Sequence, residues 1–118
     1  MGYDLYITRA KSWLETEQSP IPQSEWDEVV AADAELEIST EDFYERKGAR
    51  GDERFHAIIW TAHRDRVPLW FIDGAIQTKN PDEATVMKMV QIAKKLKARV
   101  IDEDDAEYGP DGNPLPPA

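Results

Sequence analysis

Hydrophobic and polar residues alternate along the first segment of the chain. In residues 3–10, Leu5 and Ile7 point to one side of an extended backbone, and Tyr6 and Thr8 point to the other. A period of two is typical of a half-buried β-strand. We therefore predict a first strand over residues 3–10.

A helical pattern follows a loop that contains two prolines. Trp26, Val29 and Val30 lie at the spacing that places them on one face of a helix, so we expect them to pack in the core. Ser24 is a favourable N-cap, and Asp27 would lie at the third helical position, where acidic residues favour the positive end of the helix dipole. The pattern predicts a helix that begins after Ser24.

The pattern is weaker between residues 35 and 53. Leu36 and Ile38 alternate with acidic residues, as in an edge strand, whereas residues 42–47 fit either a short strand or a helical turn. Residues 48–53, with the sequence GARGDE, favour a flexible turn.

Residues 54–80 hold the densest run of β-branched and aromatic residues. The run is interrupted at RDRVP and at Asp73-Gly74, which predicts three consecutive antiparallel strands. Residues 55–63 carry bulky side chains on both faces, which favours a strand that is covered on both sides. Asp73-Gly74 fits a two-residue type I′ turn, because both turn residues need positive φ angles.

A second helix is predicted from residue 81 to about Lys97. Asn80 would be its N-cap and Pro81 its first residue, followed by two acidic residues. Apolar residues form one stripe of this helix, and its cationic residues are expected to face water; these include Lys88, Lys94, Lys95 and Lys97. A last short strand is possible around Val100 and Ile101.

These elements predict an α+β fold. We expect an antiparallel sheet of about 4–6 strands with two helices, in the order β-α-β-β-β-β-α-(β). A chain of 118 residues suits one domain, which we place at residues 1–102. Residues 103–118 are acidic and rich in proline, with few apolar side chains, so we expect them to form a flexible tail.

Charge and composition narrow the range of functions. The formal net charge of −10 argues against binding to a phosphate backbone, so no nucleic-acid partner is expected. Cysteine is absent, which excludes disulfides and thiolate chemistry. No apolar run approaches the ~18 residues that span a bilayer. We therefore expect a cytoplasmic protein without a membrane partner.

Signatures of common enzymes are missing from the sequence. There is no nucleophile elbow, no phosphate-binding loop and no glycine-rich dinucleotide loop. His56 and His63 are expected on opposite faces of one strand, so they would not share a metal. We predict a protein that is not an enzyme and that needs no metal or cofactor. The alternative is a small enzyme with a carboxylate-based site at Asp73 or Asp102.

The charges are unevenly distributed along the chain. No Lys or Arg occurs between Ser12 and Glu45, where acidic residues are frequent, whereas several cationic residues belong to the predicted second helix. The folded protein should therefore have an acidic side that includes the first helix and could attract a basic partner. In the alternative interpretation, the two sides only balance each other within the fold.

Three segments of the chain resemble segments of small, uncharacterised bacterial proteins. They are YDLYITRA followed by Trp13, the helix entry Ser24-Glu25-Trp26 with the downstream sequence DAEL at residues 33–36, and the hairpin-to-helix junction at residues 73–100. Proteins similar to this are found as immunity partners of polymorphic or contact-delivered toxins. The resemblance implies a cytosolic inhibitor that binds one toxin domain, and it carries no catalytic residues.

A tight inhibitor needs a few aromatic anchors surrounded by complementary charge. We predict that the partner-binding residues are the acidic groups of the first helix and its approach loop, with one exposed aromatic residue: Trp13, Glu15, Glu17, Glu25, Asp27, Glu28 and Asp33. The partner would be a cognate toxin or another basic protein. Trp26, Trp60 and Trp70 are expected in the core. A regulatory binding module of another kind is the alternative function.

Overall fold

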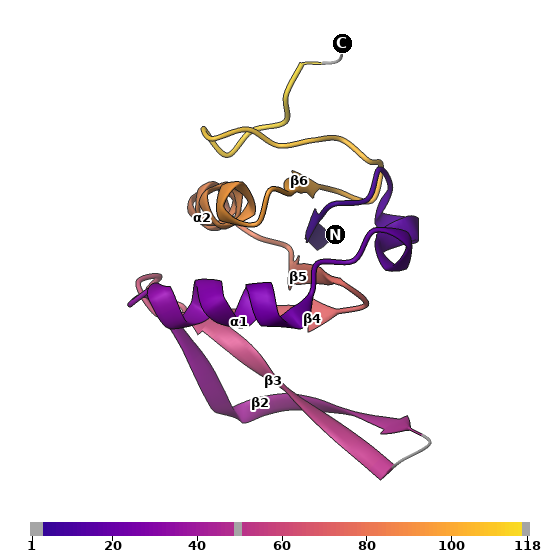
Figure 1. Ribbon diagram of the computed structural model, residues 1–118. Helices are drawn as coiled ribbons and strands as arrows, with labels where there is room; N and C mark the ends of the chain where they lie inside the picture. Colours follow the sequence, from indigo (N-terminus) through magenta and orange to yellow (C-terminus); the bar gives the residue numbers. More distant parts are fainter. Residues whose placement is uncertain (1–3, 49–50, 117–118) are drawn as a thin grey trace.

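A computed structural model describes residues 4–48 and 51–116 and contains one antiparallel sheet of six strands (Figure 1). The strands are β1 (Asp4–Thr8), β2 (Leu36–Gly48), β3 (Gly51–Trp60), β4 (Val67–Ile72), β5 (Ala75–Lys79) and β6 (Arg99–Ile101). Their order across the sheet is β2-β3-β4-β5-β1-β6. The predicted α+β class and the predicted order of elements are confirmed.

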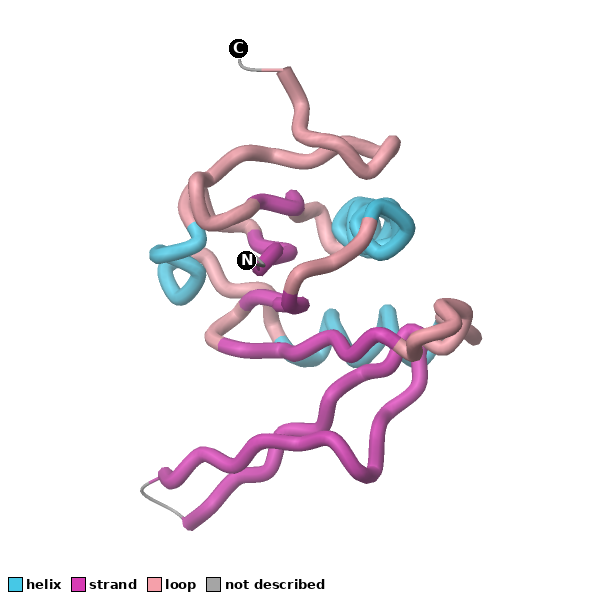
Figure 2. Tube along the Cα trace, turned by 180° about the vertical axis from the view of Figure 1, so that it is seen from behind, coloured by secondary structure: helices cyan, strands magenta, loops and turns pink. Residues whose placement is uncertain are grey.

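Three helices accompany the sheet: the short 3-10 helix η1 (Trp13–Gln18), α1 (Gln23–Ala32) and α2 (Glu83–Lys95). The two views show α2 and η1 on opposite sides of the strands (Figures 1 and 2). The α-helices pack on one face of the sheet, which we call the covered face. The opposite face carries only η1 among the described helices, and we call it the open face.

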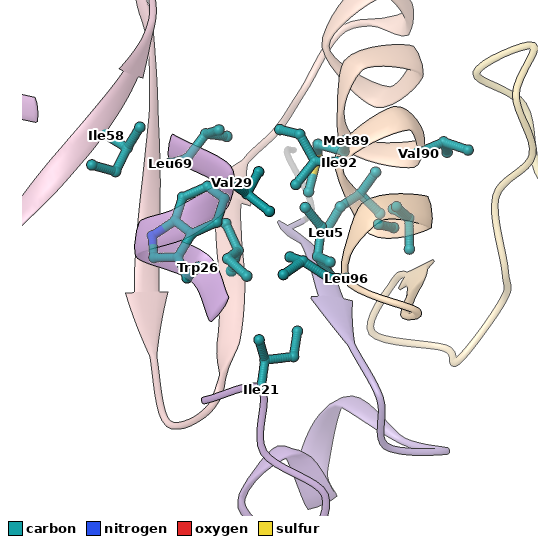
Figure 3. Packing of buried hydrophobic residues seen from close by; sticks show 14 of the residues in the cluster. Leu5, Ile21, Trp26, Val29, Ile58, Leu69, Met89, Val90, Ile92 and Leu96 are labelled. Carbon is teal, nitrogen blue, oxygen red and sulfur yellow. The ribbon is translucent and has the colours of Figure 1, made fainter. Parts of the chain in front are cut away.

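The hydrophobic core lies between the covered face and the two α-helices (Figure 3). Leu5 of β1 and Leu69 of β4 meet Trp26 of α1 and Met89 of α2, and each of these residues is at most 2% exposed. The prediction of a core position is confirmed for Trp26. Trp60 lies only at the margin of this cluster, and Trp70 is half-buried on the open face, so the core prediction was wrong for Trp70.

The β2–β3 hairpin extends beyond the rest of the sheet, as Figure 1 shows. Strand β4 pairs with β3 only between residues 58 and 60, so the distal part of the hairpin is a two-stranded ribbon. Residues 42–47 are therefore strand, because cross-strand pairs such as Phe43 with His56 extend the β2–β3 ladder beyond a register shift after Ile38. Residues 49 and 50 of the predicted turn lie outside the described residues.

The predicted turn at Asp73-Gly74 is confirmed. It joins β4 to β5, and both residues have positive φ angles, 51° and 79°. Gly74 is required here for a second reason, because a Cβ atom at this position would lie 2.5 Å from the Cβ of Pro20. The hairpin turn therefore packs closely against the loop that leads into α1.

Both α-helices begin a few residues away from their predicted starts. Helix α1 begins at Gln23 and has no side-chain cap from Ser24, since the preceding Pro22 occupies the N-cap position. Helix α2 begins at Glu83, and its N-cap is Asp82 rather than Asn80, because the Asp82 carboxylate accepts hydrogen bonds from the backbone and hydroxyl of Thr85. Local residue preferences marked both helix entries but did not select the capping residue.

The water-facing position predicted for Lys88 was also wrong. Lys88 is only 9% exposed, because its ammonium group reaches across to acidic residues that follow α1. The helix ends at Lys95, slightly earlier than the predicted Lys97, and Lys97 has a left-handed φ angle of 52°.

Residues 102–116 cross the end of β6 and then approach α2. Tyr108 is buried and belongs to the core cluster, and its backbone N–H donates to the carbonyl of Val100. This segment therefore packs through one large side chain, which the small number of apolar residues in it does not predict. Its flexibility stays a prediction.

Within residues 4–48 and 51–116, the longest helix is too short and too polar to cross a membrane.

Candidate functional site

The seven predicted partner-binding residues occupy two separate parts of the molecule. Four lie on α1 or at its C-terminal end, beside the covered face. The other three lie on η1, on the side of the open face. The fold therefore divides the acidic region that was continuous in sequence.

Glu25 is tied to the body of the protein. Its carboxylate forms a two-pronged contact with the Arg9 guanidinium at 2.9 and 3.1 Å, and Arg9 also donates to the carbonyl of Leu96 just after α2. The hydrogen bond from Arg9 lowers the pKa of Glu25. Glu25 thereby links the start of α1 to the end of α2, and its charge is largely compensated within the fold.

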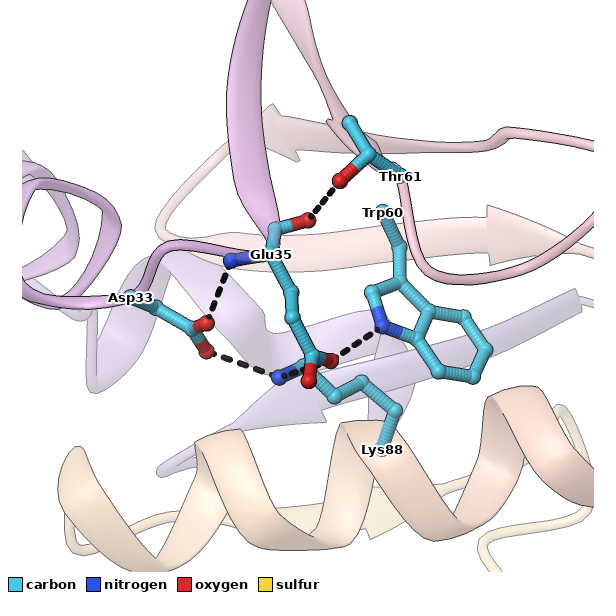
Figure 4. A network of polar contacts seen from close by, with 5 residues as sticks. All are labelled: Asp33, Glu35, Trp60, Thr61 and Lys88. Carbon is cyan, nitrogen blue, oxygen red and sulfur yellow. Dashed lines mark hydrogen bonds and ion pairs between the residues drawn. The ribbon is translucent and has the colours of Figure 1, made fainter.

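Asp33 belongs to a polar network between α1, β2, β3 and α2 (Figure 4). The Lys88 ammonium lies 2.8 Å from Asp33 and 3.1 Å from Glu35, which also accepts a hydrogen bond from the Trp60 indole at 2.9 Å. Burial raises the pKa of Asp33, but the hydrogen bonds from Lys88 and from the backbone of Glu35 outweigh it and lower the pKa overall. In the folded chain, Asp33 fastens the end of α1 to α2.

Asp27 and Glu28 are different, because both are exposed on α1. Neither forms an ion pair with any other residue that the structure describes. Of the four acidic residues predicted on or beside α1, these two keep charges that are available to a partner.

A groove of about 490 Å³ lies between α1 and the β2–β3 hairpin. Its lining includes Gln23, Trp26 and Asp27 from α1, and Ile38, Arg54 and His56 from the hairpin. Ile38 is 60% exposed, which is unusual for a large apolar side chain in a sheet. The groove therefore combines apolar surface with the free carboxylate of Asp27.

The cationic side chain at this groove already has partners. The Arg54 guanidinium contacts Glu45 at 2.9 Å and lies 4.2 Å from the centre of the Phe43 ring. His56 makes a 2.8 Å contact with the carbonyl of Ser39 through Nδ1. Among the charged residues that line the groove, Asp27 is therefore the one without an ion-pair partner among the described residues.

The three predicted residues of η1 lie at the edge of the open face. Trp13 is half-buried and stacks on Tyr6, with ring centroids 5.6 Å apart, while Glu15 and Glu17 are exposed. Sequence reasoning identified Trp13 but missed that Tyr6 and Trp70 share its side of the sheet. The alternation in residues 3–10 placed Tyr6 opposite the core face, but nothing in the sequence placed Trp70 near it.

The residues considered for chemistry have structural partners. Asp73 pairs with Arg46 at 3.1 Å, and Asp102 accepts hydrogen bonds from backbone N–H groups of its own turn and from the Tyr108 hydroxyl. His63 contacts Asp82 at 2.7 Å. No group of three or more potential metal ligands occurs among the described residues.

The chain matches no protein-family model, no curated protein and no solved structure. The function must therefore be inferred from the residues and their arrangement.

Proposed function

We propose that this chain is an immunity-type protein that binds a cognate bacterial toxin domain and inhibits it through an acidic surface. The observation that carries the proposal is the uncompensated carboxylate of Asp27 in the lining of the groove between α1 and the β2–β3 hairpin, with the exposed Glu28 next to it along α1. We call these two residues and the groove the acidic groove.

The charges of the acidic groove suit a basic partner. Exposed charges that have no internal partner keep their field in solution and attract an oppositely charged surface. Complementary charge raises the association rate and selects the partner, while affinity comes mainly from a few desolvated anchors. Asp27 and Glu28 supply the complementary charge.

Exposed apolar side chains of β2 supply the anchors that lose contact with water on binding. Ile38 is 60% exposed and Phe43 is 39% exposed, and both belong to β2. A basic toxin segment that covers these two side chains would remove apolar surface from water while its cationic groups approach Asp27. The binding of such a segment would block the toxin surface that contributes it.

The test is co-expression of the full chain with the product of the adjacent reading frame. We expect this chain to restore growth, and the double substitution Asp27→Lys and Glu28→Lys to abolish the rescue while the protein stays folded. Asp104→Lys with Asp111→Lys is the matched control, since it makes the same change in charge at two exposed positions away from α1.

Two results would overturn the proposal. An adjacent product that is not toxic would remove the immunity function and leave a binding module of another kind. Rescue that is equally strong with the α1 double variant and with the control would show that the acidic groove is not the inhibitory surface.

A further inference from the structure

A row of aromatic side chains crosses the open face of the sheet. Tyr6 of β1 lies opposite Gln77 of β5, which lies opposite Trp70 of β4. Residues that are directly opposite in an antiparallel ladder project to the same side, so these three form a line across the strands. The Tyr44 ring extends the line at 5.9 Å from Trp70, and Trp13 extends the other end by stacking on Tyr6. We call these five residues the aromatic row.

The aromatic row is hollowed along its length. One depression of about 180 Å³ is lined by Tyr6 and Trp13, and a second of about 420 Å³ is lined by Tyr44 and Trp70. Both depressions include Ile72 and Gln77, so they are adjoining parts of one shallow groove. Of the described helices, only η1 lies on this face, at the Trp13 end.

The spacing of the row matches one type of extended peptide. Trp70 and Tyr6 are two strands apart in the sheet, which corresponds to roughly 9.6 Å at the usual distance between strands. A polyproline II helix repeats every three residues, or about 9.3 Å. Tyr6 itself is only 9% exposed, with Trp13 stacked on it, so the half-buried Trp13 ring is the surface available at this end. Proline rings on one edge of such a helix could therefore rest on Trp70 and on Trp13 at successive turns.

Gln77 lies between these two aromatic positions and can bind the peptide backbone. Its amide donates one hydrogen bond to Asp4 at 2.7 Å, which fixes the orientation of the side chain. A carboxamide has two N–H donors and an acceptor oxygen, so one donor is left for a backbone carbonyl of a bound peptide. A polyproline II helix has no internal hydrogen bonds and presents such carbonyls.

Acidic groups gather at the Tyr6 end of the row, whereas Lys79, which lies opposite Asp4, lines the depression at the Trp70 end. Burial, and the nearby carboxylates of Glu103 and Asp4, raise the pKa of Tyr6 to about 12. The exposed Glu15 and Glu17 of η1 lie at the same end. A ligand that carries a cationic residue next to its proline-rich part would complement this field.

We propose that the aromatic row is a binding site for a proline-rich segment of a partner protein in the polyproline II conformation, with a Lys or Arg residue adjacent to the Tyr6 end. Such a segment is extended before it binds, so little conformational entropy is lost when it docks on flat aromatic rings. This site lies on the face opposite the acidic groove, and it does not depend on the proposed inhibition of a toxin.

The test uses a blocked synthetic peptide, Arg-Pro-Leu-Pro-Pro-Leu-Pro-Pro, titrated into the full chain by calorimetry and by tryptophan fluorescence. We expect saturable binding. A peptide with glycine in place of every proline should bind at least tenfold more weakly, because it must be ordered on binding. A peptide with Glu in place of Arg should also bind more weakly, by a factor that decreases as salt is added.

Variants of the chain locate the site. Trp70→Ala and Trp13→Ala, which alter opposite ends of the row, should each weaken binding at least tenfold, with the fold checked by circular dichroism. Met87→Ala is the control, since Met87 is an exposed apolar residue of α2; it should bind as the unmodified chain does.

Three outcomes would overturn the proposal. They are the absence of saturable binding, equal binding of the glycine peptide, and unchanged affinity in both tryptophan variants. Sedimentation of the chain alone adds a fourth: a dimer that dissociates in Trp70→Ala would identify a second copy as the occupant of the row.

Discussion

The two faces of the sheet are formed by the same strands but differ in the kind of side chain they carry. On the covered face, Leu5, Leu69 and Ile76 are at most 1% exposed beneath the helices. On the open face, alternate residues of the same strands are Tyr6, which is 9% exposed beneath Trp13, and the half-buried Gln77 and Trp70. Aliphatic residues thus fill the covered side, and large aromatic residues line the other.

This difference is informative because an uncovered sheet face is commonly polar. Antiparallel sheets that face water on one side usually place polar residues there. An aromatic row that is only partly covered keeps apolar surface in contact with water, which marks interaction sites on soluble proteins. The covered face is thus the stabilising side of the sheet, and the open face is a candidate for binding.

The largest expected effect comes from comparing one residue type on the two sides. Trp26 projects from α1 into the core and is 2% exposed, whereas Trp70 is half-buried on the open face. We expect Trp26→Ala to reduce the free energy of unfolding by about 3–5 kcal/mol, because it removes a large buried side chain and leaves a cavity. Trp70→Ala should cost less than half as much, as measured by urea unfolding at neutral pH.

Equal losses of stability in these two variants would contradict the distinction between the faces. A larger loss for Trp70→Ala would show that the aromatic row is part of the stabilising core.

A second prediction concerns the polar network that attaches α1 to α2. Lys88→Met should destabilise the protein by about 3 kcal/mol, because it leaves the Asp33 carboxylate, whose side chain is 10% exposed, without its cationic partner. Lys94→Met is the matched control on the exposed side of α2 and should change the unfolding free energy by less than about 0.5 kcal/mol. Equal changes in unfolding free energy for Lys88→Met and Lys94→Met would show that the network contributes little to holding α1 against α2.

The smallest expected effect is a dependence of stability on acidic pH at the N-terminus of α2. Hydrogen bonds from Thr85 and from His63 lower the pKa of Asp82 from 3.8 to about 2. The ionised carboxylate therefore stabilises the fold fully above pH 3.8, and this contribution is lost as the pH falls through about 2. Since the Asp82 side chain is 56% exposed, solvent screening should limit the effect to about 1 kcal/mol.

The measurement is the unfolding free energy of the unmodified chain and of Asp82→Asn between pH 2 and 6. The difference between the two proteins should shrink toward low pH. A difference that stays constant over this range would show that ionisation of Asp82 does not contribute.

The prediction of the fold succeeded where the signal was local. Alternation in β1, the Asp73-Gly74 turn and the apolar stripe of α2 each depend on residues that are close in sequence. Capping was predicted less well: Ser24 and Asn80 are favourable caps, but the structure uses Pro22 and Asp82. Each helix start contains several residues that could be the N-cap, and which of them caps the helix depends on the backbone and hydrogen bonds of the folded chain.

The candidate site was harder to predict, because its charges depend on distant partners. No local pattern separates Glu25 and Asp33 from Asp27 and Glu28. Their difference comes from Arg9 and Lys88, which are 16 and 55 residues away along the chain. The core prediction fails for Trp70 because the hydrophobicity of a residue does not reveal which face of the sheet will be covered.

By itself, the sequence determined the α+β class and most of the elements and their order, though not the state of residues 42–47 or the helix η1, because periodicity and turn chemistry act within a few residues. Only the tertiary structure decided which charges are compensated, which tryptophans are buried and which side chains align across the strands. These properties depend on contacts between segments far apart in sequence, as in the line from Tyr6 through Gln77 to Trp70. Local patterns do not specify the order of the strands, which aligns the aromatic row, or the packing of the α-helices, which leaves the open face uncovered by them.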